Sequence, residues 1–142
     1  MSFACKKNSG VKPNPEISFK ADGVAYSFNG DWNYTTTQGC TFDVTYVTSL
    51  GYTSFVGRTS SDMAFEADVY DAKVEIKTYN NVKFDCILNA IHYPVSKNAT
   101  LAITKIENNR ASGNFSGKVY TSSISTTPIN ITNGVFTDVL LR

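Results

Sequence analysis

The chain carries a single histidine, His92, so any serine or cysteine nucleophile activated by an imidazole base would have to use it. His92 lies in the segment Ala-Ile-His-Tyr-Pro, and no nucleophile motif surrounds it. A catalytic role would require a Ser, Cys or Asp side chain from elsewhere in the fold to reach the imidazole within a cleft. A small hydrolase or isomerase that uses His92 is therefore one alternative for the function of the protein.

The three cysteines, Cys5, Cys40 and Cys86, do not form a zinc-type cluster. One histidine and scattered carboxylates also lack the spacing of metal ligands, so we expect no metal and no cofactor. Cys40 and Cys86 lie in strand-like segments, and we expect both to be buried. In an oxidising compartment they could pair as a disulfide if their Cα atoms lie within about 7 Å, and two separate buried thiols are the alternative.

Aromatic residues gather around one polar loop early in the chain. They are Tyr26, Phe28, Trp32 and Tyr34, and the loop between them contributes Asn29, Asp31 and Asn33. Flat aromatic faces beside amide and carboxylate groups suit sugar rings, so the candidate ligand-binding residues are Asn29, Asp31, Trp32 and Tyr34. The alternative is that Trp32 closes the end of a hydrophobic core.

The sequence pattern predicts that the candidate residues are positioned by β-strands. Residues 112–121 alternate with a period of two, which places Gly113, Phe115, Gly117 and Val119 on a buried face. Two glycines on that face predict the close approach of another strand, or a bulge. Asp22-Gly23 and Asn133-Gly134 are the strongest hairpin signals, because a type I′ turn needs positive φ at both central residues.

Further strands are predicted along the rest of the chain. The segments are 17–20, 24–28, 40–49, 52–58, 63–70, 73–78 and 98–107, with turns at 71–72 and 108–110, and 82–91 is either a strand or a short turn of helix. Over 62–79 one helix is the alternative to the two strands, because Ala, Glu, Met and Lys are common there, but a period of two matches better than 3.6. Strands do not alternate with helices, so no parallel sheet is expected. The sequence predicts an all-β fold, an antiparallel β-sandwich of jelly-roll-like or Ig-like type, with a flattened β-barrel as the alternative.

Composition limits the functional classes. The chain has 142 residues and a net charge of +1, so it suits one domain and gives no reason to expect nucleic acid as a partner. No stretch approaches the roughly 20 apolar residues of a membrane helix. Residues 6–15 contain Gly, Pro and Asn and show no apolar periodicity, so we expect residues 1–15 to be a disordered tether and 16–142 to form the single folded domain.

Three segments, ISFKADGVAYSF, LAITKIENNRASGNFSGKVY and INITNGVFTDVLL, resemble a family of small uncharacterised lipoproteins from Bacteroidetes-type bacteria. Members commonly start with residues like Ser-Cys-Lys-Lys, carry an early Asp-Gly hairpin and end in a Gly-x-Phe-x-Gly … Ile-Thr-Asn-Gly-x-Phe pair of strands. The resemblance covers both ends of the chain. It implies an all-β, extracytoplasmic domain, attached by lipid to the outer membrane or cell surface, and it supplies no catalytic residues.

These observations favour a non-catalytic binding module of the cell envelope. Its partner would be a glycan or an envelope protein, and its contact with the membrane would be a lipid anchor only. A structural subunit of a surface assembly is a further alternative, which an apolar surface patch of several hundred Å² would favour.

We predict that Cys5 is the lipid-attachment residue. It follows Phe-Ala, an apolar and a small residue, and precedes a polar segment that spans up to about 35 Å when extended. Acyl chains contribute about 0.8 kcal/mol per buried methylene, so a multiply acylated cysteine would hold the domain at a membrane. The prediction requires a native reading frame that begins upstream of Met1, or that the sequence is a truncated form of the native protein.

The mass of the native protein, extracted from its own membranes, should exceed that of the unmodified chain by the mass of the acyl groups. Recovery of an unmodified chain from the cytosolic fraction would exclude lipid attachment.

Overall fold

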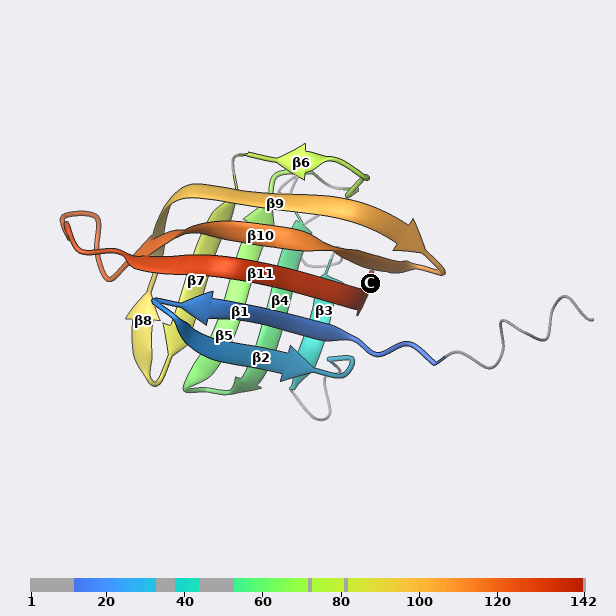
Figure 1. The fold of residues 1–142 in the computed structure, drawn as a ribbon, viewed down its shortest axis with the longest axis horizontal. Helices are drawn as coiled ribbons and strands as arrows, with labels where there is room; N and C mark the ends of the chain where they lie inside the picture. Colours follow the sequence, from blue (N-terminus) through green and yellow to red (C-terminus); the bar gives the residue numbers. More distant parts are fainter. Residues whose placement is uncertain (1–11, 33–37, 44–52, 72, 81, 142) are drawn as a thin grey trace, which may run out of the picture.

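The computed structural model describes residues 12–32, 38–43, 53–71, 73–80 and 82–141 (Figure 1). These residues form eleven β-strands. The strands are β1 (Glu16–Ala21), β2 (Val24–Asn29), β3 (Gly39–Asp43), β4 (Thr53–Ser60), β5 (Met63–Val69), β6 (Thr78–Tyr79), β7 (Lys83–Leu88), β8 (Ile91–Tyr93), β9 (Val95–Glu107), β10 (Arg110–Tyr120) and β11 (Ile129–Leu140). Within this described part of the chain, no helix is long and apolar enough to cross a membrane.

The strands build two packed antiparallel sheets, which confirms the predicted β-sandwich. One sheet has the order β2-β1-β11-β10-β9-β6 and the other the order β3-β4-β5-β7-β8. In Figure 1 the strands of the first sheet cross over those of the second. Most neighbours within each sheet are joined by hairpins, an arrangement simpler than the Greek keys of jelly rolls and Ig domains. Among the described strands none pairs with both sheets, and the isolated bridge between Asp31 and Cys40 involves a residue beyond the end of β2, so the sheets do not close into the flattened barrel that was the alternative.

The first predicted hairpin is confirmed. β1 and β2 pair in regular register from Glu16↔Asn29 to Ala21↔Val24. Asp22 and Gly23 between them have φ values of 47° and 84°, as a type I′ turn requires. The carboxylate of Asp22 also accepts a hydrogen bond of 2.7 Å from the backbone N–H of Asn130, which fixes the turn to the start of β11.

The second predicted hairpin turn is wrong. Asn133-Gly134 lies inside β11, where Asn133 has a φ of 52° and forms a bulge opposite β10. Asn-Gly is suited to positive φ, and a bulge satisfies that preference as well as a turn does. Gly134 pairs with Phe115 of β10, and a Cβ at position 134 would lie 2.6 Å from the Phe115 ring. Glycine at position 134 therefore permits the close approach of the Phe115 ring, and the Asn-Gly pair forms a bulge within β11 instead of a turn.

Two other predicted segments differ from the structure. The hairpin expected across residues 63–78 does not form, because β5 ends at Val69 and β6 is a two-residue strand that pairs with β9 in the opposite sheet. Residues 82–91 contain β7 and then a turn at Asn89-Ala90, with φ values of 52° and 67°, that leads into β8. Of the strand predicted at 40–49, β3 covers the first part, and 44–49 lie outside the described residues.

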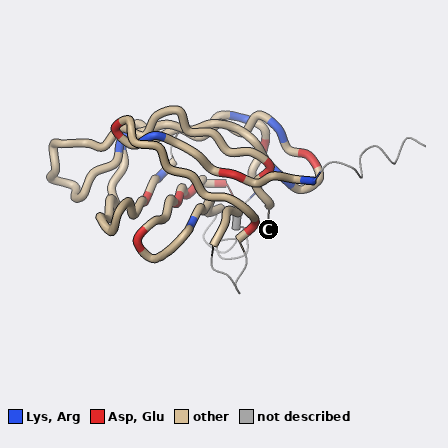
Figure 2. The backbone as a smooth tube through the Cα atoms, turned by 60° about the horizontal axis from the view of Figure 1, so that its bottom comes forward, with Lys and Arg blue, Asp and Glu red and all other residues tan. Residues whose placement is uncertain are grey.

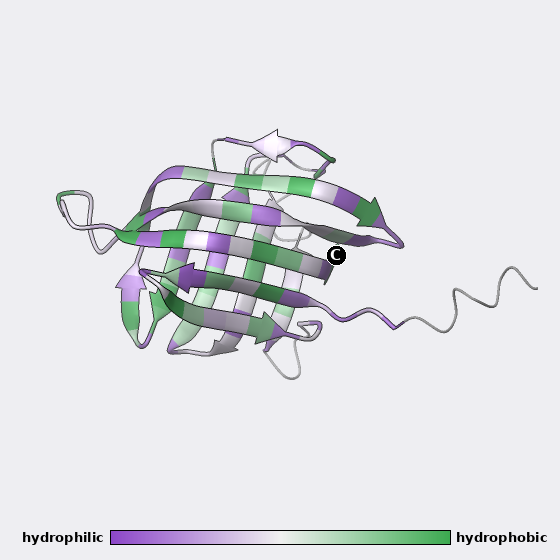
Figure 3. Cartoon of the chain, in the orientation of Figure 1, coloured by the Kyte–Doolittle hydropathy of each residue, from purple (hydrophilic) through white to green (hydrophobic). Residues whose placement is uncertain are grey.

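Phenylalanine rings fill the space between the two sheets. Seven of them are buried there: Phe19, Phe28, Phe55, Phe65, Phe84, Phe115 and Phe136. The centroids of Phe65 and Phe115 lie 4.8 Å apart across the sandwich, and so do those of Phe55 and Phe136. Hydrophobic and hydrophilic positions alternate along the strands, as expected when each strand buries one face (Figure 3).

The folded domain begins slightly before the predicted boundary at residue 16. The backbone N–H of Gly30 donates to the carbonyl of Pro15 at 2.9 Å, and Pro15 is buried. The N–H of Asn14 donates to the Asp138 carboxylate at 3.4 Å. These two residues, assigned to the tether from composition, therefore contact the end of the sandwich.

Cys40 and Cys86 are both buried, as predicted. Both are free thiols, so they do not form the disulfide that the sequence allowed. The register runs from Cys40 to Gly57, from Gly57 to Phe65 and from Phe65 to Cys86, across three strand spacings. At about 4.8 Å per spacing the two Cα atoms lie about 14 Å apart, twice the limit for a disulfide.

We predict that Gly113→Ala destabilises the domain by at least about 2 kcal/mol, because a Cβ would meet the carbonyl of Ala102 and lie 2.6 Å from the Phe136 ring. Asn114→Ala, at the exposed neighbouring position, should change the free energy of unfolding by no more than about 0.5 kcal/mol. Urea denaturation of both variants makes the comparison. Equal stabilities would contradict this packing.

Candidate functional site

A polar groove lies at the end of the six-stranded sheet where the N-terminal chain enters. It has a volume of about 510 Å³ and is lined by Pro13, Lys105, Glu107, Asn108, Arg110, Ser112 and Asp138. These residues come from the N-terminal segment, the β9–β10 hairpin with the strand ends beside it, and the C-terminal end of β11. Charged residues of both signs lie at this end of the molecule, as Figure 2 shows. Such a volume falls in the range of small-molecule sites.

Two bulges shape the floor of the groove around Ser112 of β10. Thr104 is the extra residue on the β9 side and Asp138 the extra residue on the β11 side. Asp138 has a φ of 51°, and its N–H donates to the Ser112 hydroxyl at 3.0 Å, while the Thr104 hydroxyl donates to the Ser112 carbonyl at 3.2 Å. Bulges re-aim side chains at the rims of sheets, and here they replace regular pairing with polar groups beside a cavity.

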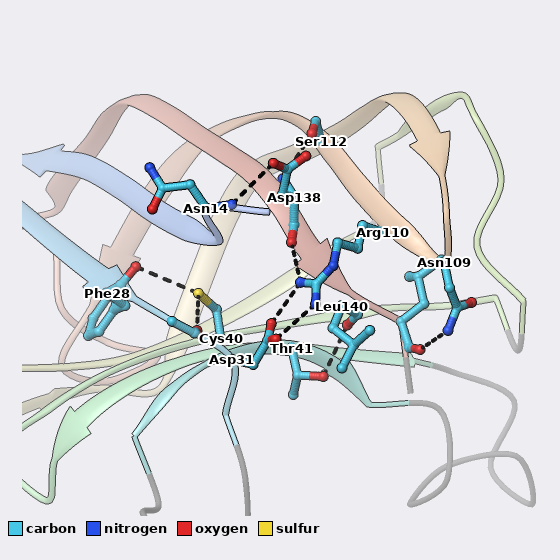
Figure 4. Close-up of polar contacts among 12 residues, drawn as sticks. Asn14, Phe28, Asp31, Cys40, Thr41, Asn109, Arg110, Ser112, Asp138 and Leu140 are labelled. Atoms are coloured by element: carbon cyan, nitrogen blue, oxygen red, sulfur yellow. Dashed lines mark hydrogen bonds and ion pairs between the residues drawn. The ribbon is translucent and has the colours of Figure 1, made fainter. Parts of the chain in front are cut away.

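Arg110 holds the groove to the predicted ligand-binding loop (Figure 4). Its guanidinium donates two hydrogen bonds of 2.8 Å to the two carboxylate oxygens of Asp31, and a third of 2.9 Å to the carbonyl of Asp138. These hydrogen bonds to Asp31 raise the pKa of Arg110 above its already high value. The side chain is only 17% exposed, so the planar fork is fixed in one orientation.

The structure brings together only some of the predicted ligand-binding residues. Asp31 forms the ion pair with Arg110, and Trp32 follows it directly with a partly exposed side chain. Asn29 is exposed at the end of β2. Tyr34 lies outside the described residues. The aromatic loop is therefore adjacent to the groove through Asp31, whereas the lining itself comes from residues that the sequence did not single out.

Cys40 lies under the same loop. Its sulfur is 3.3 Å from the carbonyl of Gly30 and 3.6 Å from that of Phe28, positions that a thiol can donate to. Burial, with the negative charges of Asp31 and Glu16, raises the pKa of Cys40 to about 12. The group is therefore a neutral thiol that supports the loop, and it is not a nucleophile.

A second polar cluster lies on the outer face of the five-stranded sheet. His92 of β8 has its Nε2 2.7 Å from Oδ1 of Asp85 on β7. Asp85 pairs in register with Glu66 of β5, and Asp68 accepts a 2.9 Å hydrogen bond from the Ser54 hydroxyl. The cluster thus combines one imidazole with three carboxylates.

Glu66 is the perturbed member of this cluster. Its partial burial, the neighbouring charges of Asp68 and Asp85 and a hydrogen bond to Asp68 raise its pKa to about 7, against a smaller opposing effect of Arg58. When Glu66 is protonated, its O–H can donate a hydrogen bond to a neighbouring carboxylate. Two ionised carboxylates have no proton to share and repel each other.

An enzyme that uses His92 as a base would need an Asp to orient the imidazole and a nucleophile within its reach. Among the described residues, the structure supplies only the Asp. An Asp lies within reach of the imidazole, but no hydroxyl or thiol is bonded to it there. Cys86 of the same strand as Asp85 is on the core side, and burial raises its pKa. In the described part of the chain, no group of three or more His, Cys, Asp or Glu side chains is arranged to hold a metal ion.

Comparison with protein-family models, curated proteins and solved structures finds no match to this chain.

We predict that Glu66 makes stability depend on pH. Its pKa is raised in the fold, so its contribution is fully present below the unfolded value of about 4.5 and is lost as the pH rises through about 7. Glu66→Gln should be more stable than the wild type at pH 8 by about 1–2 kcal/mol, less than the whole shift implies because water screens a partly exposed carboxyl, and the two should converge near pH 4.

Thermal unfolding at a series of pH values gives this difference. Glu75→Gln removes an exposed carboxylate outside the cluster and controls for the loss of one charge. A Glu66→Gln variant that loses stability at pH 8 would contradict the assignment.

Proposed function

We propose that this protein is a non-catalytic β-sandwich binding module of the cell envelope that holds a glycan in the groove beside Arg110. The single observation that carries the proposal is the lining of the groove. Its ammonium, carboxylate, amide and hydroxyl groups come from Lys105, Glu107, Asn108, Ser112 and Asp138. Sugar hydroxyls both donate and accept hydrogen bonds, so a mixed polar lining complements them.

The Asp31–Arg110 ion pair supports the same proposal. It fixes Asp31, which directly precedes Trp32, the only tryptophan of the chain, beside Arg110 of the groove lining. Aromatic rings can stack on sugar rings while polar groups bind the hydroxyls, so Trp32 is the aromatic side chain that we expect to respond to a bound sugar.

The envelope location and the lipid anchor are part of the proposal and rest on the sequence. Cys5 and residues 6–11 lie outside the described residues, and Pro13, the first lining residue of the groove, follows them closely. If Cys5 is acylated, the groove lies at the end of the domain nearest the anchor. The resemblance to Bacteroidetes-type lipoproteins supports this arrangement.

A partner protein and a surface assembly are less well supported. The large apolar side chains exposed among the described residues come from different elements: Val24, Tyr70, Ile76, Ile91, Ile124 and Val135. Single exposed apolar side chains are normal on a soluble surface, whereas protein interfaces need a contiguous patch.

We predict that oligosaccharides change the fluorescence of Trp32 on binding and that Asn108→Gly weakens this binding about three- to tenfold. The substitution removes an amide from the groove but keeps a turn whose φ is 53°, and one neutral hydrogen bond contributes about 0.5–1.5 kcal/mol.

Asn89→Gly is the matched control, because it makes the same change in a turn with a φ of 52° at the β7–β8 hairpin. A panel of neutral, amine-bearing and acidic oligosaccharides, titrated by fluorescence and by calorimetry, covers the main sugar classes. The proposal fails if no member of the panel binds, or if the two glycine variants weaken binding equally.

A further inference from the structure

The charges around the groove do not cancel. Two cations, Lys105 and Arg110, face three carboxylates, Asp31, Glu107 and Asp138. Lys105 lies 3.8 Å from Glu107. Two of these carboxylates therefore each form an ion pair with one cation. Asp138 is the third, and the charge of Arg110 acts on it without an ion pair between the two side chains in the described part of the chain.

Arg110 does not form with the Asp138 carboxylate the bidentate ion pair that it forms with Asp31. Both carboxylate oxygens of Asp31 accept hydrogen bonds from its guanidinium, and its third hydrogen bond goes to the backbone carbonyl of Asp138. Among the described residues, the Asp138 carboxylate forms no ion pair, and the hydrogen bond that it accepts is the 3.4 Å contact from the Asn14 N–H. A partly buried carboxylate with one long hydrogen bond has acceptor capacity left for a ligand.

The backbone explains how this carboxylate comes to be there. Asp138 is the bulged residue of β11, with a φ of 51°, a conformation that Asp and Asn adopt more readily than most residues. In a regular strand the position would follow the alternation of its neighbours. The bulge instead places the carboxylate on the wall of the groove.

We propose that the groove binds an amine-bearing saccharide and that Asp138 is the counter-ion of its ammonium group. The assignment rests on the proposed glycan-binding function and names the class of glycan. Asp138 accepts from the ammonium, while Ser112, Asn108 and the Lys105–Glu107 pair line the space for the ring hydroxyls. An acidic sugar would place a second negative charge beside Asp138 and is disfavoured.

The test compares two ligands that differ only at the nitrogen: the tetrasaccharide of β-1,4-linked glucosamine and its fully N-acetylated form. At a pH below the pKa of the sugar amine, we expect the free amine to bind at least about tenfold more tightly, because a charge-assisted hydrogen bond replaces a neutral one. Raising the salt concentration should reduce this preference. An acidic tetrasaccharide of galacturonic acid should bind most weakly.

Asp138→Asn removes the charge, keeps the shape and tolerates the positive φ, so it should fold and lose the preference for the amine. Asp62→Asn makes the same charge change in an exposed turn of the other sheet and should retain the preference. Calorimetry and Trp32 fluorescence report binding, and thermal unfolding confirms that both variants are folded. Should Asp138→Asn not fold, Asp138→Gly, which also tolerates the positive φ, takes its place in the same comparison.

The two levels of the proposal can fail separately. Binding of the N-acetylated or acidic sugar as tight as that of the free amine would overturn the counter-ion role and leave glycan binding standing. An amine preference that survives Asp138→Asn would assign the effect to other charges and would also overturn it. If no saccharide binds, both the counter-ion role and the glycan-binding function are wrong.

Discussion

The constraint on which the structure depends is the fit of phenylalanine rings against glycines. A Cβ on any of four strand glycines would come within 3 Å of a ring: Gly57 against Phe28, Gly113 against Phe136, Gly117 against Phe84 and Gly134 against Phe115. Protein interiors are packed at crystal density, so a ring and a Cβ cannot share this space. Large side chains from one strand therefore fill the positions that a neighbouring or facing strand leaves empty, and this holds the two sheets in one register.

That fit is achieved at the expense of regular pairing. β11 carries bulges at Asn133 and Asp138, and β9 carries them at Asn98 and Thr104, on the two sides of β10. The glycines Gly113, Gly117 and Gly134 lie close to these register shifts. Each bulge contains a residue whose backbone groups do not take part in the regular hydrogen bonds between strands. At one end of the sheet, the bulged residue Asp138 lines the groove. The core packing and the candidate site are in this sense consequences of the same irregular strands.

The sequence could predict what depends on local chemistry. The Asp22-Gly23 turn, the alternation of β10 and the close approach at Gly113 and Gly117 all follow from neighbouring residues. Asn133-Gly134 shows the limit, because the same local preference for positive φ suits a turn or a bulge, and the choice is made by Phe115 from another strand. The candidate site could be predicted only in part for the same reason. Asp31 and Trp32 stand in a suggestive loop, but Arg110 lies 79 residues from Asp31 and no local pattern connects them.

The Asp31–Arg110 pair is best understood as a positioning device. Partly exposed ion pairs contribute little net stability, because desolvation and side-chain ordering offset most of the attraction. A bidentate pair nevertheless allows one relative orientation of its two planar groups. Arg110 is also anchored to the Asp138 carbonyl, so the loop after β2, the start of β10 and the bulge of β11 are fixed relative to one another. Binding a ligand at the groove would then cost little further ordering of the chain, which is how preorganised sites gain affinity.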